Sequence, residues 1–210
     1  MKSVKIVLLA VVTALMVSCG TTRVVPISGR TQTLLVNDEQ VLSLSNQEYS
    51  NFMKSAKVST NSNNTAMVKR VGQRLATAVE SYLKNNGLSS ELKNFSWEFN
   101  LVQNKEANAF CMPGGKIVVY EGLLPYTQNE ASLAIVLGHE IAHAVAKHSA
   151  EQMSTQIRNQ YGTQILGGVL EAAGVSSTTT QLAQILTQKG LQFRSLKYSR
   201  NHETEADRMG

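Results

Sequence analysis

The sequence predicts an α+β fold that is mainly helical and carries a small β-sheet. Three observations lead to this prediction. Apolar side chains recur every three or four residues over 68–83, the pattern of an amphipathic helix. Residues 130–154 continue without proline and form a second, longer helical segment. Residues 95–102 alternate apolar and polar side chains, and residues 115–121 follow a proline-glycine turn; both segments are typical of strands.

The other expected elements follow from capping residues and helix breakers. Residues 59–64 are rich in serine, threonine and asparagine, which cap helices, and Gly87 can end the helix that follows them. The remaining expected segments are a short extended piece over 33–36, a first helix over 46–57, two helices over 156–172 and 179–192, and a last helix from Ser199.

Composition excludes several classes of protein. With 42% hydrophobic and 17% charged residues, the 210-residue chain is neither collagen-like nor wholly disordered. The net charge of +5 comes from scattered basic residues without an interleaved aromatic stripe, so no nucleic-acid partner is expected. The chain has one long apolar run, at its N-terminus, which excludes a polytopic membrane protein.

The N-terminus has the layout of a secretory signal peptide. Two lysines precede twelve largely apolar residues, 6–17, which are too few to cross a bilayer. The sequence Met16-Val17-Ser18-Cys19 resembles a bacterial lipobox. We therefore expect three parts: a lipoprotein signal peptide over 1–18, a lipid-anchored tether over 19–45 and a folded domain over 46–210.

The two cysteines have different expected roles. Acylation of Cys19 would tie the chain to a membrane. Gly20 after it favours the outer membrane of a bacterial cell envelope, with the domain facing the periplasm. Cys111 then has no partner for a disulfide, and we expect it to be a small buried side chain.

The strongest chemical signal is the run His139-Glu140-Ile141-Ala142-His143. On a helix, His139 and His143 lie one turn apart on the same face and can bind one zinc ion. Glu140 is rotated by about 100° from His139, so its carboxylate can take a proton from a metal-activated water. Apolar neighbours indicate a buried helix, where ionisable side chains are costly unless they have a role.

A catalytic zinc needs a third protein ligand. A third histidine in the same stretch does not fit, because Ser149 occupies the tenth position after His139 and no glycine turn intervenes. His148 lies off that pattern, and we interpret it as a solvated helix residue.

A later helix offers the better candidates. Glu203 and Asp207 lie one turn apart, so Glu203 can bind the metal while Asp207 hydrogen-bonds the distal nitrogen of a ligand histidine. His202 is the alternative ligand, and Glu205 is expected to be solvated.

Four stretches together resemble the gluzincin metallopeptidases related to the CAAX prenyl proteases, in the branch of bacterial periplasmic lipoproteins. They are residues 108–110 with 113–115, residues 118–124, residues 139–143, and residues 199–200 with 203–210. The combination is more specific than the histidine motif alone, and it spans about half the chain. The resemblance implies a zincin-like peptidase domain with one zinc ion.

The resemblance also implies where substrate binds. In this family the strand after the glycine pair lines the cleft, and its free edge pairs with an extended polypeptide. The residues of that strand here are Lys116, Ile117, Val118, Val119 and Tyr120. An ordinary interior strand is the alternative, and Asn108 either holds its loop or contacts substrate. The candidates for stabilising the oxyanion, which we do not rank, are Tyr198, Arg200 and His202.

Together, the residues and the resemblance predict a zinc-dependent endopeptidase that hydrolyses unfolded or misassembled envelope proteins, with Glu140 as general base. The alternative is a periplasmic chaperone or assembly module that binds extended polypeptides around a non-catalytic zinc. Three protein ligands beside Glu140 favour chemistry, because structural zinc sites usually close with four. Since the last helix would reach Gly210 after at most three turns, we also expect the chain to be truncated at its C-terminus.

Overall fold

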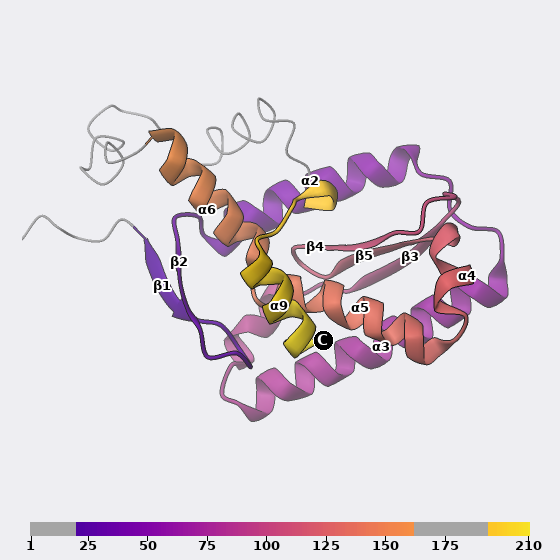
Figure 1. The fold of residues 1–210 in the computed structure, drawn as a ribbon, viewed down its shortest axis with the longest axis horizontal. Helices are drawn as coiled ribbons and strands as arrows, with labels where there is room; N and C mark the ends of the chain where they lie inside the picture. The colour runs from indigo at the N-terminus through magenta and orange to yellow at the C-terminus, as the bar shows by residue number, and fades with distance from the viewer. Residues whose placement is uncertain (1–19, 162–192) are drawn as a thin grey trace, which may run out of the picture.

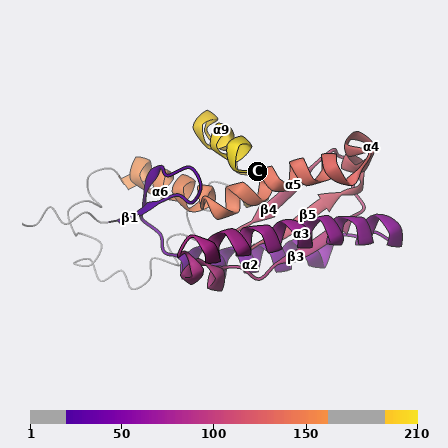
Figure 2. The ribbon, with the colours of Figure 1, turned by 90° about the horizontal axis from the view of Figure 1, so that it is seen from below.

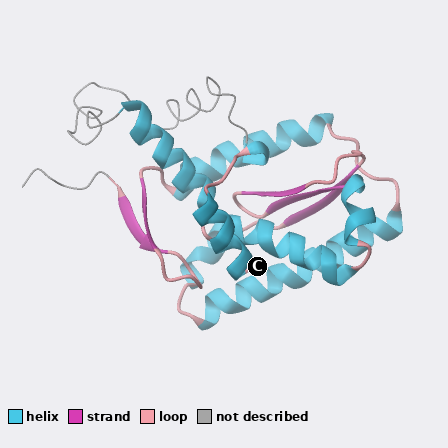
Figure 3. Cartoon of the chain, viewed as in Figure 1, coloured by secondary structure: helices cyan, strands magenta, loops and turns pink. Residues whose placement is uncertain are grey.

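The structure is a computed structural model that describes residues 20–161 and 193–210. The predicted signal peptide, Cys19, the predicted helix over 179–192 and most of that over 156–172 lie outside the described residues. The predicted α+β class is confirmed: helices surround a small sheet, and a separate hairpin lies at one end (Figures 1 and 3). Among the described helices, none combines the length and the hydropathy that a membrane span requires.

The bounds of the elements, in chain order, are β1 (Thr21–Val24), β2 (Thr31–Leu34), α2 (Asp38–Ser55), α3 (Ser62–Asn85), η1 (Ser89–Asn94), β3 (Glu98–Val102), β4 (Ala109–Met112), β5 (Lys116–Tyr120), η2 (Glu121–Leu123), α4 (Leu124–Thr127), α5 (Glu130–Val145), α6 (His148–Tyr161), η4 (Phe193–Ser195) and α9 (Arg200–Met209). The predicted amphipathic helix is confirmed as α3, which Asn61 caps and which Gly87 follows at a φ of 73°. The last helix is confirmed as α9, with Ser199 as its N-cap.

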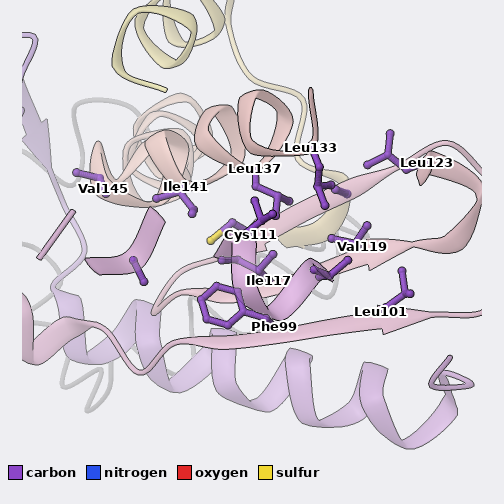
Figure 4. Packing of buried hydrophobic residues seen from close by; sticks show 14 residues of the cluster. Phe99, Leu101, Cys111, Ile117, Val119, Leu123, Leu133, Leu137, Ile141 and Val145 are labelled. Atoms are coloured by element: carbon purple, nitrogen blue, oxygen red, sulfur yellow. The ribbon is translucent and has the colours of Figure 1, made fainter. Parts of the chain in front are cut away.

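The three-stranded sheet has the order β3-β5-β4, with β5 parallel to β3 and antiparallel to β4. Because side chains alternate along a strand, the sheet supplies two separate hydrophobic clusters. Residues of α3 and α5 complete one cluster, and residues of α2 and α6 complete the other. Figure 4 shows the first, in which Leu137 and Ile141 of α5 face Ile117 of β5. This packing fixes α5, which carries the histidine motif, against the sheet.

The structure corrects the role of the strand Lys116–Tyr120. It is β5, the central strand, and all five of its residues are buried. Its backbone pairs with β3 on one side and with β4 on the other, so it has no free edge for a substrate. β5 is therefore an ordinary interior strand, which was the alternative to a substrate-binding strand. β3 and β4 are the edge strands of this sheet; residues 57–59 pair with the end of β3, whereas no strand among the described residues pairs with the outer edge of β4.

The single helix expected over 130–154 is also wrong, because two helices occupy that range. α5 ends at Val145, and Lys147 adopts a left-handed backbone conformation at a φ of 56° that turns the chain into α6. This conformation is unfavourable for a residue with a side chain. The Lys147 ammonium group lies 2.7 Å from Asp38 and 2.8 Å from Glu91, and these ion pairs hold the turn.

Residues 20–45, where the sequence predicts a tether, contain regular structure. β1 and β2 form an antiparallel hairpin, and α2 begins at Asp38, eight residues before the predicted first helix. Val25, Leu34 and Val36 are buried, so this segment contributes to the packed body. Its strands are only four residues long and partly polar, which explains why their periodicity is weak in the sequence.

The last helix, α9, crosses α5 in Figure 1, and Figure 2 shows it packed on the side of α5 that faces away from α3. The two helices approach closely at Gly138, where the backbone oxygen of Gly210 lies 2.9 Å from the position that a Cβ atom would occupy. A side chain at position 138 would therefore push the end of α9 away. Glycine at this point allows the residues of α9 to reach the histidines of α5.

Candidate metal centre

Three predicted ligands converge at the crossing of α5 and α9. The donor atoms of His139, His143 and Glu203 all lie within 4.8 Å of one another. The Nε2 atoms of the two histidines are 3.0 Å apart, and the Glu203 Oε2 atom lies 3.3 Å from that of His139 and 3.8 Å from that of His143. His202, the alternative ligand, lies outside this group.

The donor set fits a zinc ion. A tetrahedral zinc with bonds of about 2.0–2.2 Å holds its ligand atoms about 3.3–3.6 Å apart, close to the three observed distances. The ring of His139 is oriented by Asp207, whose Oδ1 atom lies 2.8 Å from Nδ1. Since the Nδ1 proton is donated to Asp207, Nε2 presents a lone pair toward the other donors. A cation between these lone pairs would satisfy them, whereas they repel one another without it.

The second histidine is buried and neutral. His143 has only 3% of its surface exposed. Burial, followed by the charges of the neighbouring histidines, lowers the pKa of His143 to about 3. Its lone pair is therefore available at neutral pH, as a metal ligand requires.

Glu140 lies half-buried beside this group, on the side of the sheet. Burial raises the pKa of Glu140 to about 7; the negative charge of Glu203 adds to this rise, while His139 and the Cys111 backbone oppose it. The backbone N–H of Cys111, on the free edge of β4, donates a hydrogen bond to the Glu140 carboxylate. Glu140 is thus placed as a carboxylate that can both accept and release a proton near neutral pH.

The prediction for Cys111 itself is confirmed. It is a buried free cysteine, packed with Leu137 and Ile141 of α5 in the cluster of Figure 4. Burial raises the pKa of its thiol well above the usual range.

Two predictions in this region are wrong. His148, expected to be solvated, is completely buried, and its Nδ1 atom lies 2.8 Å from Nδ1 of His143. Glu205, also expected to be solvated, is buried, and its Oε2 atom lies 2.8 Å from Nε2 of His148. The break at Lys147 causes the first error, since it turns His148 inward at the start of a new helix.

Arg30 in the hairpin completes this buried cluster. Its guanidinium group donates hydrogen bonds to both carboxylate oxygens of Glu205 and of Glu151. Although burial alone would raise it, hydrogen bonds from Arg30, Ser28 and His148 lower the pKa of Glu205 to about 2. Sequence spacing gives no signal for this contact, because Arg30 and Glu205 are 175 residues apart.

Two of the three candidates for stabilising the oxyanion are engaged elsewhere. The Tyr198 hydroxyl lies 2.8 Å from the Ser149 hydroxyl, and its ring stacks on His143 with centroids 4.1 Å apart. The Nε2 atom of His202 lies 3.3 Å from a Glu151 oxygen. Arg200, the third candidate, is exposed in the first turn of α9.

Comparison with known proteins agrees with this geometry. The model for peptidase family M48 matches residues 62–210. Mitochondrial metalloendopeptidase OMA1 of Schizosaccharomyces pombe is 38% identical over 132 residues, which are 63% of this chain and 36% of that protein. The human mitochondrial metalloendopeptidase OMA1 is 30% identical over 186 residues, 88% of this chain and 35% of that protein.

A bacterial relative is similar to a shorter part of the chain. The beta-barrel assembly-enhancing protease of Escherichia coli O157:H7 is 37% identical over 121 residues, 54% of this chain and 24% of that protein. The chain thus spans about a quarter to a third of the length of these relatives. All three relatives bear the names of proteases, and two are named metalloendopeptidases. Because the family model covers well over half of the residues, the chain belongs to peptidase family M48.

Proposed function

We propose that the protein is a zinc-dependent endopeptidase with one zinc ion per chain. One observation carries this proposal: three donor atoms from His139, His143 and Glu203 lie within 4.8 Å of one another, with Glu140 beside them. Three protein ligands leave one position of a tetrahedral zinc open, as catalytic sites require. The family and the names of the relatives support the same activity.

Different residues of the site would carry out different parts of peptide hydrolysis. Zinc, when bound, would act as a Lewis acid toward a carbonyl oxygen and make water a nucleophile near neutral pH. The Glu140 carboxylate accepts the proton of the attacking water and later donates it to the leaving amine. The Cys111 N–H holds this carboxylate in place, and Asp207 holds the ring of His139.

The free edge of β4 is our candidate for binding an extended polypeptide. The carbonyl of Asn108 accepts a hydrogen bond from the N–H of Tyr120, which directs this residue toward β5. Since antiparallel partners alternate, the backbone groups of Ala109 and Cys111 point away from β5. The N–H of Cys111 is donated to Glu140, which leaves the backbone groups of Ala109 and the Cys111 carbonyl for a partner strand. The contact of Cys111 with Glu140 supports the proposal that a substrate strand added here would present its scissile bond to the site.

We propose unfolded or misassembled proteins of the bacterial envelope as substrates. Strand addition engages the main chain and therefore selects extended rather than folded polypeptides. A bacterial relative is named for enhancing the assembly of beta-barrels. We further propose that acylated Cys19 anchors the protein at the outer membrane, facing the periplasm.

The test combines metal analysis with a matched pair of variants. Glu140→Gln should retain one zinc per chain and lose casein hydrolysis by at least about 100-fold, because the general base is gone. Glu130→Gln makes the same change at the exposed start of α5 and should hydrolyse casein like the wild type. A chelator should abolish hydrolysis in both active proteins.

The alternative, a chaperone or assembly module with a non-catalytic zinc, predicts a different result. Its wild-type protein would bind unfolded casein without cleaving it, and Glu140→Gln would change nothing. Full peptidase activity in Glu140→Gln would refute the role of Glu140. A wild-type protein without bound zinc would refute the metal site.

A further inference from the structure

A chain of hydrogen bonds, buried except at its last member Arg30, leads from the proposed zinc ligand His143 to the N-terminal hairpin. His143 contacts His148, His148 contacts Glu205, and Arg30 binds the Glu205 carboxylate with contacts of 2.8–3.1 Å. The first two contacts are 2.8 Å long. His148 carries out none of the proposed chemistry, yet it is among the most buried polar side chains of the described residues.

The protons of this chain can be placed in one consistent way. If His143 binds the metal through Nε2, its proton is on Nδ1 and is donated to Nδ1 of His148. His148 then carries its own proton on Nε2 and donates it to Glu205. The other ligand, His139, reaches its carboxylate Asp207 directly. For His143, the buried side chain of His148 lies between the ligand and the Glu205 carboxylate. The usual orienting contact is thus extended by one residue.

The rings along this chain have little freedom to rotate. Tyr198 stacks on His143 with centroids 4.1 Å apart and planes within 16°. His202 stacks on His148 with centroids 4.4 Å apart and planes within 18°. Each hydrogen bond therefore holds a ring whose plane is already fixed by packing.

The same chain also acts on the third ligand, because Glu205 and Glu203 are on one helix. Two residues correspond to about 200° of rotation, so Glu205 anchors the inner face of α9 while Glu203 points to the metal from the other side. Arg30 joins this inner face to Glu151 on α6. The hairpin thus clamps α9 against the helix that carries His148.

We propose that His148, Glu205 and Arg30 are positioning residues that set the geometry of the ligands His143 and Glu203. The N-terminal hairpin, which carries Arg30, thereby contributes to zinc binding. The inference rests on the proposed zinc site. It predicts that zinc affinity depends on Arg30 as well as on the ligands, although Arg30 lies more than 100 residues before them in the sequence.

The test compares three substitutions at His148 in the full-length protein. His148→Asn places an amide oxygen near the position of Nδ1 and can still accept the His143 proton, so its zinc dissociation constant should stay within about threefold of wild type. His148→Gln keeps a donor for Glu205 but loses that acceptor, and His148→Leu loses both. Zinc binding by these two should weaken about 10- to 100-fold. Competition with a chromophoric chelator measures the dissociation constant.

A spectroscopic measurement distinguishes a change in ligand geometry from a general loss of protein structure. Cobalt(II) replaces zinc, and its visible absorption reports the geometry of the ligands. The spectrum should change in His148→Gln and stay like wild type in His148→Asn. Arg30→Ala should weaken zinc binding about tenfold. The matched control, Arg23→Ala, removes an arginine from the same hairpin that pairs with Glu91 instead, and should leave zinc binding unchanged.

The outcomes distinguish this inference from the proposed function. A folded His148→Leu protein with wild-type zinc affinity and cobalt spectrum would overturn the inference and leave the zinc site intact. If His148→Leu does not fold, equal affinities of His148→Asn and His148→Gln would overturn it. Equal affinities of Arg30→Ala and Arg23→Ala would remove the hairpin from the site. Absence of zinc from the wild type would overturn the proposed function itself.

Discussion

Replacing Asp207 should weaken zinc binding by an amount that its exposure determines. Its carboxylate lies 2.8 Å from Nδ1 of His139 and holds the ring so that Nε2 faces Nε2 of His143 and the Glu203 carboxylate. A buried hydrogen bond between charged groups contributes about 1.5–3 kcal/mol. Because 71% of the Asp207 side chain is exposed, water screens the contact and the lower end applies. A loss of about 1.4 kcal/mol corresponds to a tenfold higher dissociation constant. We therefore expect Asp207→Ala to bind zinc about tenfold more weakly.

The assay is chelator competition at pH 7, with two further variants. Asp207→Asn keeps an acceptor for the Nδ1 proton but removes the charge, so it should fall between wild type and Asp207→Ala. Arg208→Ala alters the neighbouring exposed charge on α9 without touching His139, and it should bind zinc like the wild type. If Asp207→Ala bound zinc within twofold of wild type, the orienting contact would have no role in affinity.

Three further predictions concern stability. Gly72→Ala gains about 1 kcal/mol of helix propensity, but its Cβ would lie 2.2 Å from the ring of Phe99. Since overpacking costs about 1–3 kcal/mol, urea unfolding should show a net loss of up to about 2 kcal/mol; a stabilised variant would contradict the clash. In the metal-free protein, wild type should be more stable than Arg30→Ala above about pH 5, and the difference should shrink as the pH falls from 5 toward 2. The folded-state pKa of Glu205 is lowered from 4.5 to about 2, so its contribution is lost as pH falls through that range. Removal of zinc should speed hydrogen exchange in α9, which supplies Glu203, while α5 stays protected; equal protection of α9 with and without zinc would argue against coupling.

Local spacing was sufficient to pair the candidate metal-site residues because each pair lies within one helical turn. His139 and His143 are four residues apart, as are Glu203 and Asp207, and a helix alone brings each pair to one face. Spacing could not place α9 against α5. The placement was expected only because a catalytic zinc needs a third protein ligand, and the structure shows that the missing side chain of Gly138 permits the close approach of the two helices.

The burial of His148 and Glu205 could not be predicted from spacing, because it depends on contacts between distant segments. A helix continued through Lys147 would point His148 elsewhere, and nothing in the sequence marks the left-handed turn at a lysine. The ion pairs of Lys147 with Asp38 and Glu91 join residues that are far apart in the chain. Polar residues whose partners are distant are interpreted as solvated by default, and this is where sequence reasoning fails.

The central position of β5 has a similar cause. Its apolar run is typical of a strand buried on both faces, but the order of strands in a sheet is not encoded by periodicity. β4 consists of four residues that are all buried, so it has no alternation to reveal it. The sheet edge next to Glu140 therefore belongs to β4, the strand with the weakest sequence pattern.

The two histidines proposed as ligands are held in different ways, and this difference gives the site a buried side and an open side. His143 has 3% of its surface exposed, and it is fixed by a buried chain of side chains that ends at Arg30. The His139 side chain is 25% exposed, and it is fixed by a carboxylate in solvent. Glu203 is 47% exposed on the same side as His139. Among the residues that the structure describes, the donor atoms are therefore more open to solvent on the side of His139 and Glu203 than on the side of His143. The contacts of His148, Glu205 and Arg30 lie behind His143, on the buried side. Because they hold both His143 and the helix that carries Glu203, a substitution among them would displace both proposed ligands together.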